Sequence, residues 1–176
     1  MTHQYEDLIR LFNQTFYADY HTQLVLGGDE PIYLPADDVT PYHRIIFAHG
    51  FYSSALHEIS HWLVAGPKRR LLEDFGYWYE PDGRTQEEQA TFEAVEVRPQ
   101  AYEWILSVSA GFPFTVSCDN LNGEFEPDRV QFMTRVHREV LSILAAGLPT
   151  RVAMLSHALQ TFYNTPPLSA EQFIVK

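Results

Sequence analysis

The hydrophobic pattern of the chain opens with an amphipathic helix between Tyr5 and Tyr20. Apolar residues recur there at three- and four-residue intervals, as expected for one helix face. They are Leu8, Ile9, Leu11, Phe12 and Phe16. Gly27-Gly28-Asp29 then separates this helix from two short apolar runs, Glu30 to Pro35 and Arg44 to Ala48. We predict a short strand for each run, because prolines flank the first and β-branched residues fill the second.

A second helical pattern follows and carries the motif His57-Glu58-Ile59-Ser60-His61. Ser53 or Ser54 is the expected N-cap, and Gly66-Pro67 ends the helix. Its apolar residues at helical spacing are Leu56, Ile59, Leu63 and Val64. Histidines four residues apart on a helix have Cβ atoms roughly 6 Å apart, so both imidazoles can reach one metal ion. The pattern therefore predicts a helix that supplies two nitrogen ligands.

Three further helical patterns make up most of the C-terminal half. Thr85-Gln86-Glu87-Glu88 is a capping-box sequence that opens the first, which ends near Gly111. Pro99 inside it either begins a new helix or kinks a continuous one. The second pattern runs from Pro127 to Gly147 and the third from about Thr150 to Tyr163.

The run from Phe112 to Leu121 is aromatic and β-branched and precedes Asn122-Gly123, a turn sequence typical of hairpins. Helices nevertheless dominate the pattern, and only a few short strands accompany them. At 176 residues the chain has the length of one domain. We therefore predict a single, helix-dominated α+β domain spanning residues 1–176.

Two segments near the middle of the chain leave their roles open. The aromatic run Phe75 to Tyr79, which precedes the turn sequence Pro81-Asp82-Gly83, either walls a pocket or forms a buried strand. Lys68-Arg69-Arg70 is more typical of a solvated helix start than of a binding patch, although both segments are candidates for contacting a protein partner.

His49, at the end of the second predicted strand, either lines the site or satisfies a backbone carbonyl.

Charge and composition narrow the possible functions. The formal net charge of −11 argues against non-specific binding to nucleic acid or to anionic membranes and favours a cationic partner. Cys118 is the only cysteine, so neither an intrachain disulfide nor a thiolate metal cage is expected. The N-terminus has no basic region followed by an apolar run, and the sequence has no apolar stretch of membrane length. We therefore expect a cytoplasmic protein.

Two imidazoles leave a metal under-ligated, so a third protein ligand is expected from elsewhere in the chain. Carboxylates are dense between Phe92 and Gln100. Glu96, beside the irregularity at Pro99, is the preferred ligand, and Glu93, one turn away, is the alternative. Asp119 is a more distant candidate.

Two histidines and a carboxylate are compatible with two kinds of metal chemistry. With zinc, Glu58 would be the general base acting on a metal-bound water, as in metallopeptidase-like hydrolases. With ferrous iron, the same ligands would form a facial triad with open positions for dioxygen and substrate. A third possibility is a purely structural metal with a closed coordination shell. The ligand types do not choose between zinc and iron.

Two competing arrangements are weaker. His137 and Glu139, with His157 downstream, have the order of a cupin oxygenase site, but residues two apart on a helix face different directions. A serine hydrolase would need Gly-x-Ser-x-Gly at a strand-to-helix turn, and Gly50-Phe51-Tyr52-Ser53-Ser54 does not match it.

Seven segments together resemble the bacterial elongation factor P hydroxylase family, and they cover essentially the whole chain. The resemblance is carried by Asp29 to Ala36, Phe47 to Tyr52, His57 to Trp62, Asp74 to Tyr79, Val95 to Ala101, Val116 to Leu121 and Phe125 to Val130. It is far more specific than the histidine motif alone.

This resemblance implies an iron-dependent monooxygenase with Fe²⁺ as cofactor. The implied substrate is the β-lysylated lysine of translation elongation factor P, together with dioxygen, in the final step of that modification. The implied metal ligands are His57, His61 and a glutamate between Glu93 and Gln100, which we take to be Glu96. Glu58 is expected to transfer protons or to support the ligands. The family fold would not be the jelly roll of most iron oxygenases, so a 2-oxoglutarate co-substrate is not implied.

Overall fold

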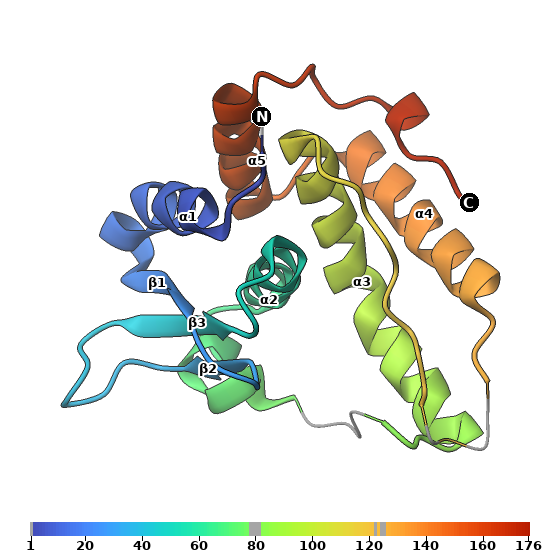
Figure 1. Cartoon of the computed structure of the whole chain (residues 1–176), viewed down its shortest axis with the longest axis horizontal. Helices are drawn as coiled ribbons and strands as arrows, with labels where there is room; N and C mark the ends of the chain where they lie inside the picture. Colours follow the sequence, from blue (N-terminus) through green and yellow to red (C-terminus); the bar gives the residue numbers. More distant parts are fainter. Residues whose placement is uncertain (1, 78–81, 122, 124–125) are drawn as a thin grey trace.

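The computed structural model describes residues 2–77, 82–121, 123 and 126–176, which form a small sheet and a set of packed helices (Figure 1). The α-helices are α1 (Tyr5–Tyr20), α2 (Tyr52–Val64), α3 (Gln86–Ala110), α4 (Arg129–Ala146) and α5 (Thr150–Tyr163). The strands are β1 (Thr22–Leu26), β2 (Ile32–Leu34) and β3 (His43–Phe47). Short 3₁₀ helices lie at Arg69–Leu71, Glu73–Gly76 and Ala170–Gln172. This helix-dominated arrangement confirms the predicted α+β class.

The sheet has the order β1-β3-β2, with β3 parallel to β1 and antiparallel to β2. The two strands predicted from the sequence are confirmed as β2 and β3. Strand β1 was not predicted from the sequence; it begins directly after the left-handed residue His21, which ends α1. β1 has only five residues, and its pairing of Leu24 with Ile45 is a long-range contact that the local pattern does not reveal.

The histidine helix α2 lies in the centre of the molecule, between the sheet and α3 (Figure 1). Its fully buried side chains, among them Leu56, Ile59 and Trp62, pack into the core. The helix begins one or two residues before the predicted caps, so Ser53 and Ser54 lie inside its first turn and do not cap it. The burial of α2 among these neighbours fixes the direction in which its histidines point.

Arg151 of α5 ties down the C-terminal end of α2. Its guanidinium donates hydrogen bonds to the carbonyls of Trp62 (2.8 Å), Leu63 (3.2 Å) and Ala65 (2.9 Å). It also lies over the Trp62 ring, 4.4 Å from the ring centroid. The carbonyls of Trp62 and Leu63 are among the last of the helix and have no partner within it, and that of Ala65 directly follows it. The arginine therefore supplies hydrogen bonds that α2 itself cannot make.

We expect Arg151→Met to lower the free energy of unfolding by about 2–3 kcal/mol, because it removes the arginine donor from the carbonyls of Trp62 and Leu63 while keeping an apolar stem. Arg135→Met, at an exposed position on α4, is the matched control and should change stability little. Urea unfolding of both variants tests this expectation. Equal stabilities of the two variants would contradict the role assigned to Arg151.

Helix α3 is continuous through Pro99, so Pro99 does not begin a new helix. The predicted capping box is present: Thr85 accepts a hydrogen bond from the Glu88 backbone, and the Glu88 side chain accepts one from the Thr85 backbone. The helix ends at Gly111, which is left-handed (φ 66°), as the sequence indicated. Helix α4 starts two residues later than predicted, with Asp128 as its N-cap, and α5 has the predicted bounds.

The segment from Phe112 to Leu121 runs alongside α3 (Figure 1), and its described residues form no strand despite their β-like composition. Side chains of α3 satisfy part of its backbone instead. Gln100 bonds both the N–H and the carbonyl of Ser117, and Gln89 donates to the carbonyl of Cys118. We refer to residues 112–121 as the α3-side segment. Asn122 of the predicted turn lies outside the described residues.

Among the described residues, no single helix is both long and apolar enough to span a membrane. Only α4 and α5 taken together, across a 95° bend, pass by length and composition.

Candidate metal centre

Helix α3 carries a stripe of polar residues that faces inward. Gln89, Glu93, Glu96, Gln100, Glu103 and Ser107 follow one another at intervals of four and three residues, and all are buried. This is the spacing at which a helix normally presents its apolar face to the core. Burying carboxylates and amides is costly unless they are paired, so the stripe indicates a polar site inside the protein.

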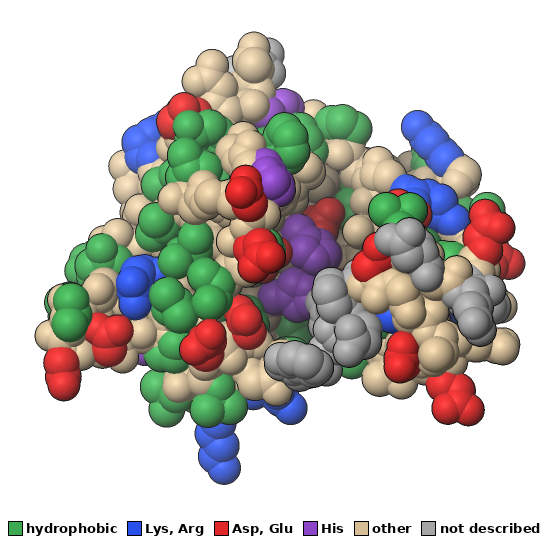
Figure 2. Space-filling model, turned by 60° about the horizontal axis from the view of Figure 1, so that its bottom comes forward, with side chains coloured by type: hydrophobic (Ala, Val, Ile, Leu, Met, Phe, Trp, Pro, Cys, Tyr) green, Lys and Arg blue, Asp and Glu red, His purple; other side chains and the backbone are tan. Residues whose placement is uncertain are grey.

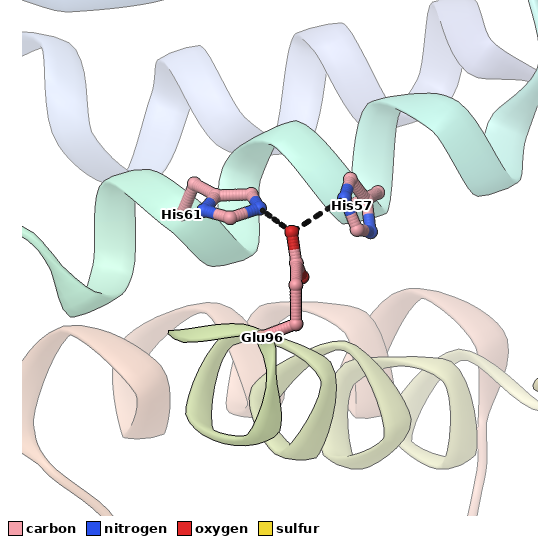
Figure 3. Close-up of side chains that lie close together, drawn as sticks. All are labelled: His57, His61 and Glu96. Atoms are coloured by element: carbon pink, nitrogen blue, oxygen red, sulfur yellow. Dashed lines mark ion pairs between the residues drawn. The ribbon is translucent and has the colours of Figure 1, made fainter. Parts of the chain in front are cut away.

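Three side chains converge where this stripe meets α2 (Figure 3). Glu96 points from α3 toward His57 and His61 on α2, and its Oε1 lies 3.2 Å from His61 Nε2 and 3.9 Å from His57 Nε2. The ligand atoms of the three residues all lie within 4.8 Å of one another. The carboxylate of Glu96 is almost completely buried, with 1% of the residue exposed. The structure therefore brings together the three residues chosen as ligands from the sequence.

The donor set fits a divalent metal ion. Around an ion with bonds of about 2.1 Å, neighbouring ligand atoms lie ~3.0–3.4 Å apart. The distance between His61 Nε2 and Glu96 Oε1 already lies in this range. The distance between His57 Nε2 and Glu96 Oε1 exceeds its upper end by about half an ångström. Two imidazole nitrogens and a carboxylate oxygen, without sulfur, suit ferrous iron and zinc alike.

Glu103 holds the other nitrogen of His57. The distance from His57 Nδ1 to Glu103 Oε1 is 2.6 Å, and Glu103 lies two turns after Glu96 on the same face of α3. A carboxylate that accepts the Nδ1–H fixes the tautomer in which Nε2 is free to bind a metal. The imidazole of His57 is thus oriented with Nε2 toward Glu96.

The carboxylates also set the charge of His57. Burial disfavours the imidazolium, but Glu103, followed by Glu96 and Glu58, outweighs burial and raises the pKa of His57 to about 10. In the metal-free protein the ring is therefore protonated at neutral pH, and its positive charge offsets the buried carboxylates. A metal ion bound at Nε2 would replace that proton.

A cavity of about 640 Å³ opens beside His57 and is lined by His49, Glu58 and Glu103. In Figure 2, histidine side chains lie at the floor of a hollow with acidic side chains along its rim. His49 therefore lines the site, which was one of its two predicted roles, and its left-handed backbone (φ 62°) is part of the turn from β3 into α2.

Glu58 lines the cavity but does not belong to the three-residue group, as its place next to His57 on the helix predicted. Burial raises the pKa of Glu58, while His57 and His61 act in the opposite direction. A carboxyl group with a raised pKa can give and take a proton closer to neutral pH than an exposed one.

The other candidate residues lie elsewhere among the described residues. Glu93 is buried on α3 but outside the ligand group, and Asp119 lies on the α3-side segment at the cavity edge, 3.4 Å from Arg129. In the cupin-like set, His137 Nε2 lies 3.0 Å from the Phe173 carbonyl and Glu139 pairs with Arg98. His157 is exposed on α5, so this set does not converge.

The basic cluster and the aromatic run are largely engaged within the protein. Arg69 stacks on Tyr77 and donates to the Phe75 carbonyl, and Arg70 donates to the Ala65 carbonyl. Phe75 is buried and stacked on Tyr33, in a 3₁₀ helix. Of the two alternatives left open for the aromatic run, the strand therefore does not hold for residues 75–77. Trp78 and Tyr79 lie outside the described residues.

Gln100 and Glu103, which contact the proposed ligands, were not predicted from the sequence. A signal is present in the alternating four- and three-residue spacing of polar residues from Gln89 to Ser107. The apolar positions of this helix do not reveal it, because part of the inward face is polar.

Comparisons with known proteins identify a family that matches this chain. A family model described as elongation factor P hydroxylase matches residues 11–173. A curated relative from Haemophilus influenzae, named elongation factor P lysine hydroxylase, is 59% identical over 165 residues, which cover 94% of this chain and 92% of that protein.

Proposed function

The chain belongs to the elongation factor P hydroxylase family, and we propose that it hydroxylates a lysine of translation elongation factor P. The main support for this proposal is that His57, His61 and Glu96 converge beside an open cavity. The chain that carries them matches the family model over residues 11–173. In finer detail, we propose that the acceptor is the β-lysylated lysine, that the reaction is the last step of its modification, and that residues 1–176 act as one domain in the cytoplasm.

We propose Fe²⁺ as the metal and His57, His61 and Glu96 as its ligands. Bound iron would activate dioxygen. One oxygen atom would be inserted into a C–H bond of the substrate, and the other would leave as water after taking up two protons and two electrons from an external reductant. The support is a donor set of two nitrogens and one oxygen, which leaves several coordination positions for dioxygen and substrate.

The cavity suits a long cationic side chain. Its lining includes the carboxylates of Asp29, Glu58 and Asp119 together with Arg129, which pairs with Asp119. Its volume is sufficient for an extended lysyl arm. Carboxylates lower the energy of an ammonium group that leaves water, so a positively charged arm is favoured over a neutral or acidic one. The proposed ligand His57 also lines the cavity, which supports a metal within reach of that arm.

Glu58 is proposed to hold or transfer a proton beside the bound substrate. We expect Glu58→Gln to retain metal but to lower the hydroxylation rate by about 10²–10⁴-fold, because the amide cannot exchange a proton. Metal content and single-turnover rate are measured on the same preparation. Full activity with intact metal binding would exclude an essential proton-transfer role for Glu58.

A zinc hydrolase remains the chemical alternative offered by the histidine motif, with Glu58 as its base. The comparisons give it no support, since both name a hydroxylase.

The experiment that tests the proposed function is intact-mass spectrometry of β-lysylated elongation factor P after incubation with ferrous-loaded protein, reductant and air. We expect the mass to increase by one oxygen atom, and to remain unchanged in an anaerobic control. No increase in air, from protein that has retained its iron, would contradict the hydroxylase assignment and call for a peptide-cleavage assay.

A further inference from the structure

Gln100 joins the proposed metal ligand Glu96 to the α3-side segment. Its side chain is completely buried. The amide group donates from Nε2 to the Ser117 carbonyl (2.7 Å) and accepts from the Ser117 N–H at Oε1 (2.9 Å). The same Nε2 lies 3.3 Å from Glu96 Oε2 and donates to it.

These contacts fix which way the amide is turned. Oε1 must face the Ser117 N–H and Nε2 must face the Ser117 carbonyl, since the reverse arrangement would oppose donor to donor and acceptor to acceptor. One hydrogen of Nε2 serves the carbonyl, which leaves the other for Glu96. The backbone of Ser117 therefore determines that Gln100 presents a donor to the carboxylate.

The two oxygens of Glu96 consequently have different neighbours. Oε1 faces His57 and His61, whereas Oε2 accepts the hydrogen bond from Gln100. A carboxylate can bind a metal through one oxygen or through both, and an oxygen held by a donor on the far side is disfavoured as a second ligand. The arrangement offers the metal only Oε1.

We infer that Gln100 is a positioning residue that keeps Glu96 a one-oxygen ligand and so preserves an open coordination position. This inference rests on the proposed function, because it takes Glu96 to be a metal ligand. Gln100 acts through Glu96 and does not touch the reacting atoms.

The same contacts connect the ligand to the cavity wall. Ser117 lines the cavity together with Thr115 and Val116 of the α3-side segment. A displacement of this wall would move the amide of Gln100 and, through it, Oε2 of Glu96. Substrate that packs against the wall can thus affect the ligand without contacting it.

The test counts the exchangeable water molecules on Mn²⁺ bound to the purified protein, using ¹⁷O-water electron–nuclear resonance and water-proton relaxation. Three protein donor atoms on an octahedral ion leave about three water positions in the wild type. In Gln100→Met, which preserves length and removes the donor, we expect Glu96 to bind through both oxygens and the count to fall by about one.

Gln89→Met is the matched control. Gln89 is also a buried glutamine of the α3 stripe and also bonds the α3-side segment, through the Cys118 carbonyl, but no bond joins it to Glu96 among the described contacts. We expect its water count to equal that of the wild type. Gln100→Ala is the second variant if Gln100→Met does not fold, because it also removes the donor to Glu96 and adds no charge beside it.

An unchanged water count in a folded Gln100 variant would overturn the inference, as would an equal fall in Gln89→Met. A wrong ligand assignment gives a different result, since Glu96→Ala would then keep Mn²⁺ as tightly as the wild type. That outcome would overturn both the ligand set and the role of Gln100.

Discussion

Replacing Glu96 with alanine is expected to abolish stoichiometric Fe²⁺ binding, whereas replacing Glu93 with alanine is expected to leave it intact. Glu96 Oε1 is the only oxygen in the group formed with His57 and His61 among the described residues. A residue that merely orients a ligand costs about 10–100-fold in metal affinity when it is lost, so the loss of a ligand should exceed about 100-fold. Hydroxylation of elongation factor P should fall with the metal content.

Glu93 makes a strict control for this experiment. It is a glutamate on the same helix, one turn from Glu96, and it is also buried. Both variants therefore remove a buried carboxylate from the same stripe, and only one removes a proposed ligand. Iron content after desalting and calorimetric titration give the comparison. If the Glu96 variant kept its iron and the Glu93 variant lost it, the third ligand would be reassigned to Glu93.

The second large effect concerns Glu103. We expect Glu103→Gln to weaken metal binding by about 10–100-fold, because the carboxylate stabilises positive charge on His57 whether a proton or a metal supplies it. The amide also no longer requires that the Nδ1 of His57 be the protonated nitrogen. Glu93→Gln is the matched control, because it makes the same change at a buried position of α3 outside the ligand group. This variant should bind metal like the wild type.

The pH dependence follows from the raised pKa of His57. In the metal-free protein the pKa is about 10 when folded and near 6.5 when unfolded, so protonation stabilises the fold fully below pH 6.5. That contribution is lost as the pH rises from 6.5 to 10. We expect thermal unfolding of the metal-free protein to show this loss, and the metal-loaded protein not to show it, because its His57 carries no titrating proton at Nε2.

Metal binding near pH 7 should accordingly release one proton from His57, and metal affinity should rise with pH up to about 10. Calorimetry in buffers of different ionisation enthalpy measures the released proton. In Glu103→Gln the release should decrease, since the principal cause of the raised pKa is gone. Equal proton release in the two proteins would contradict the assigned cause.

Much of the fold could be predicted from local patterns, and the failures have physical reasons. The helices were recognised because each carries its own apolar spacing, cap or terminating glycine, as in the capping box at Thr85. Strand β1 was missed because its stability comes from pairing with β3, which is distant in sequence. The α3-side segment has the composition of a strand, yet glutamine side chains and not a neighbouring strand satisfy part of its backbone.

The site was predictable to the extent that it is local. His57 and His61 belong to one helical motif, so their convergence follows from helix geometry. The choice of Glu96 over Glu93 depends on the packing of α3 against α2, which no local pattern shows. The family resemblance indicated only the segment from Glu93 to Gln100, and the place of Glu96 beside Pro99 favoured it within that segment. Glu103 and Gln100 could have been found only by treating regularly spaced polar residues as a buried face.

The polar stripe of α3 has a consequence for local unfolding. From Gln86 to Arg98, the first half of the helix buries three polar side chains, Gln89, Glu93 and Glu96, and one apolar side chain, Phe92. This half gains little from removing apolar surface from water, which is the main force that docks helices. Its amides should therefore exchange with solvent before those of the second half in metal-free protein. A bound ion would link this half to α2 and slow that exchange. The amide exchange rates of the first half of α3 would then report whether the metal site is occupied.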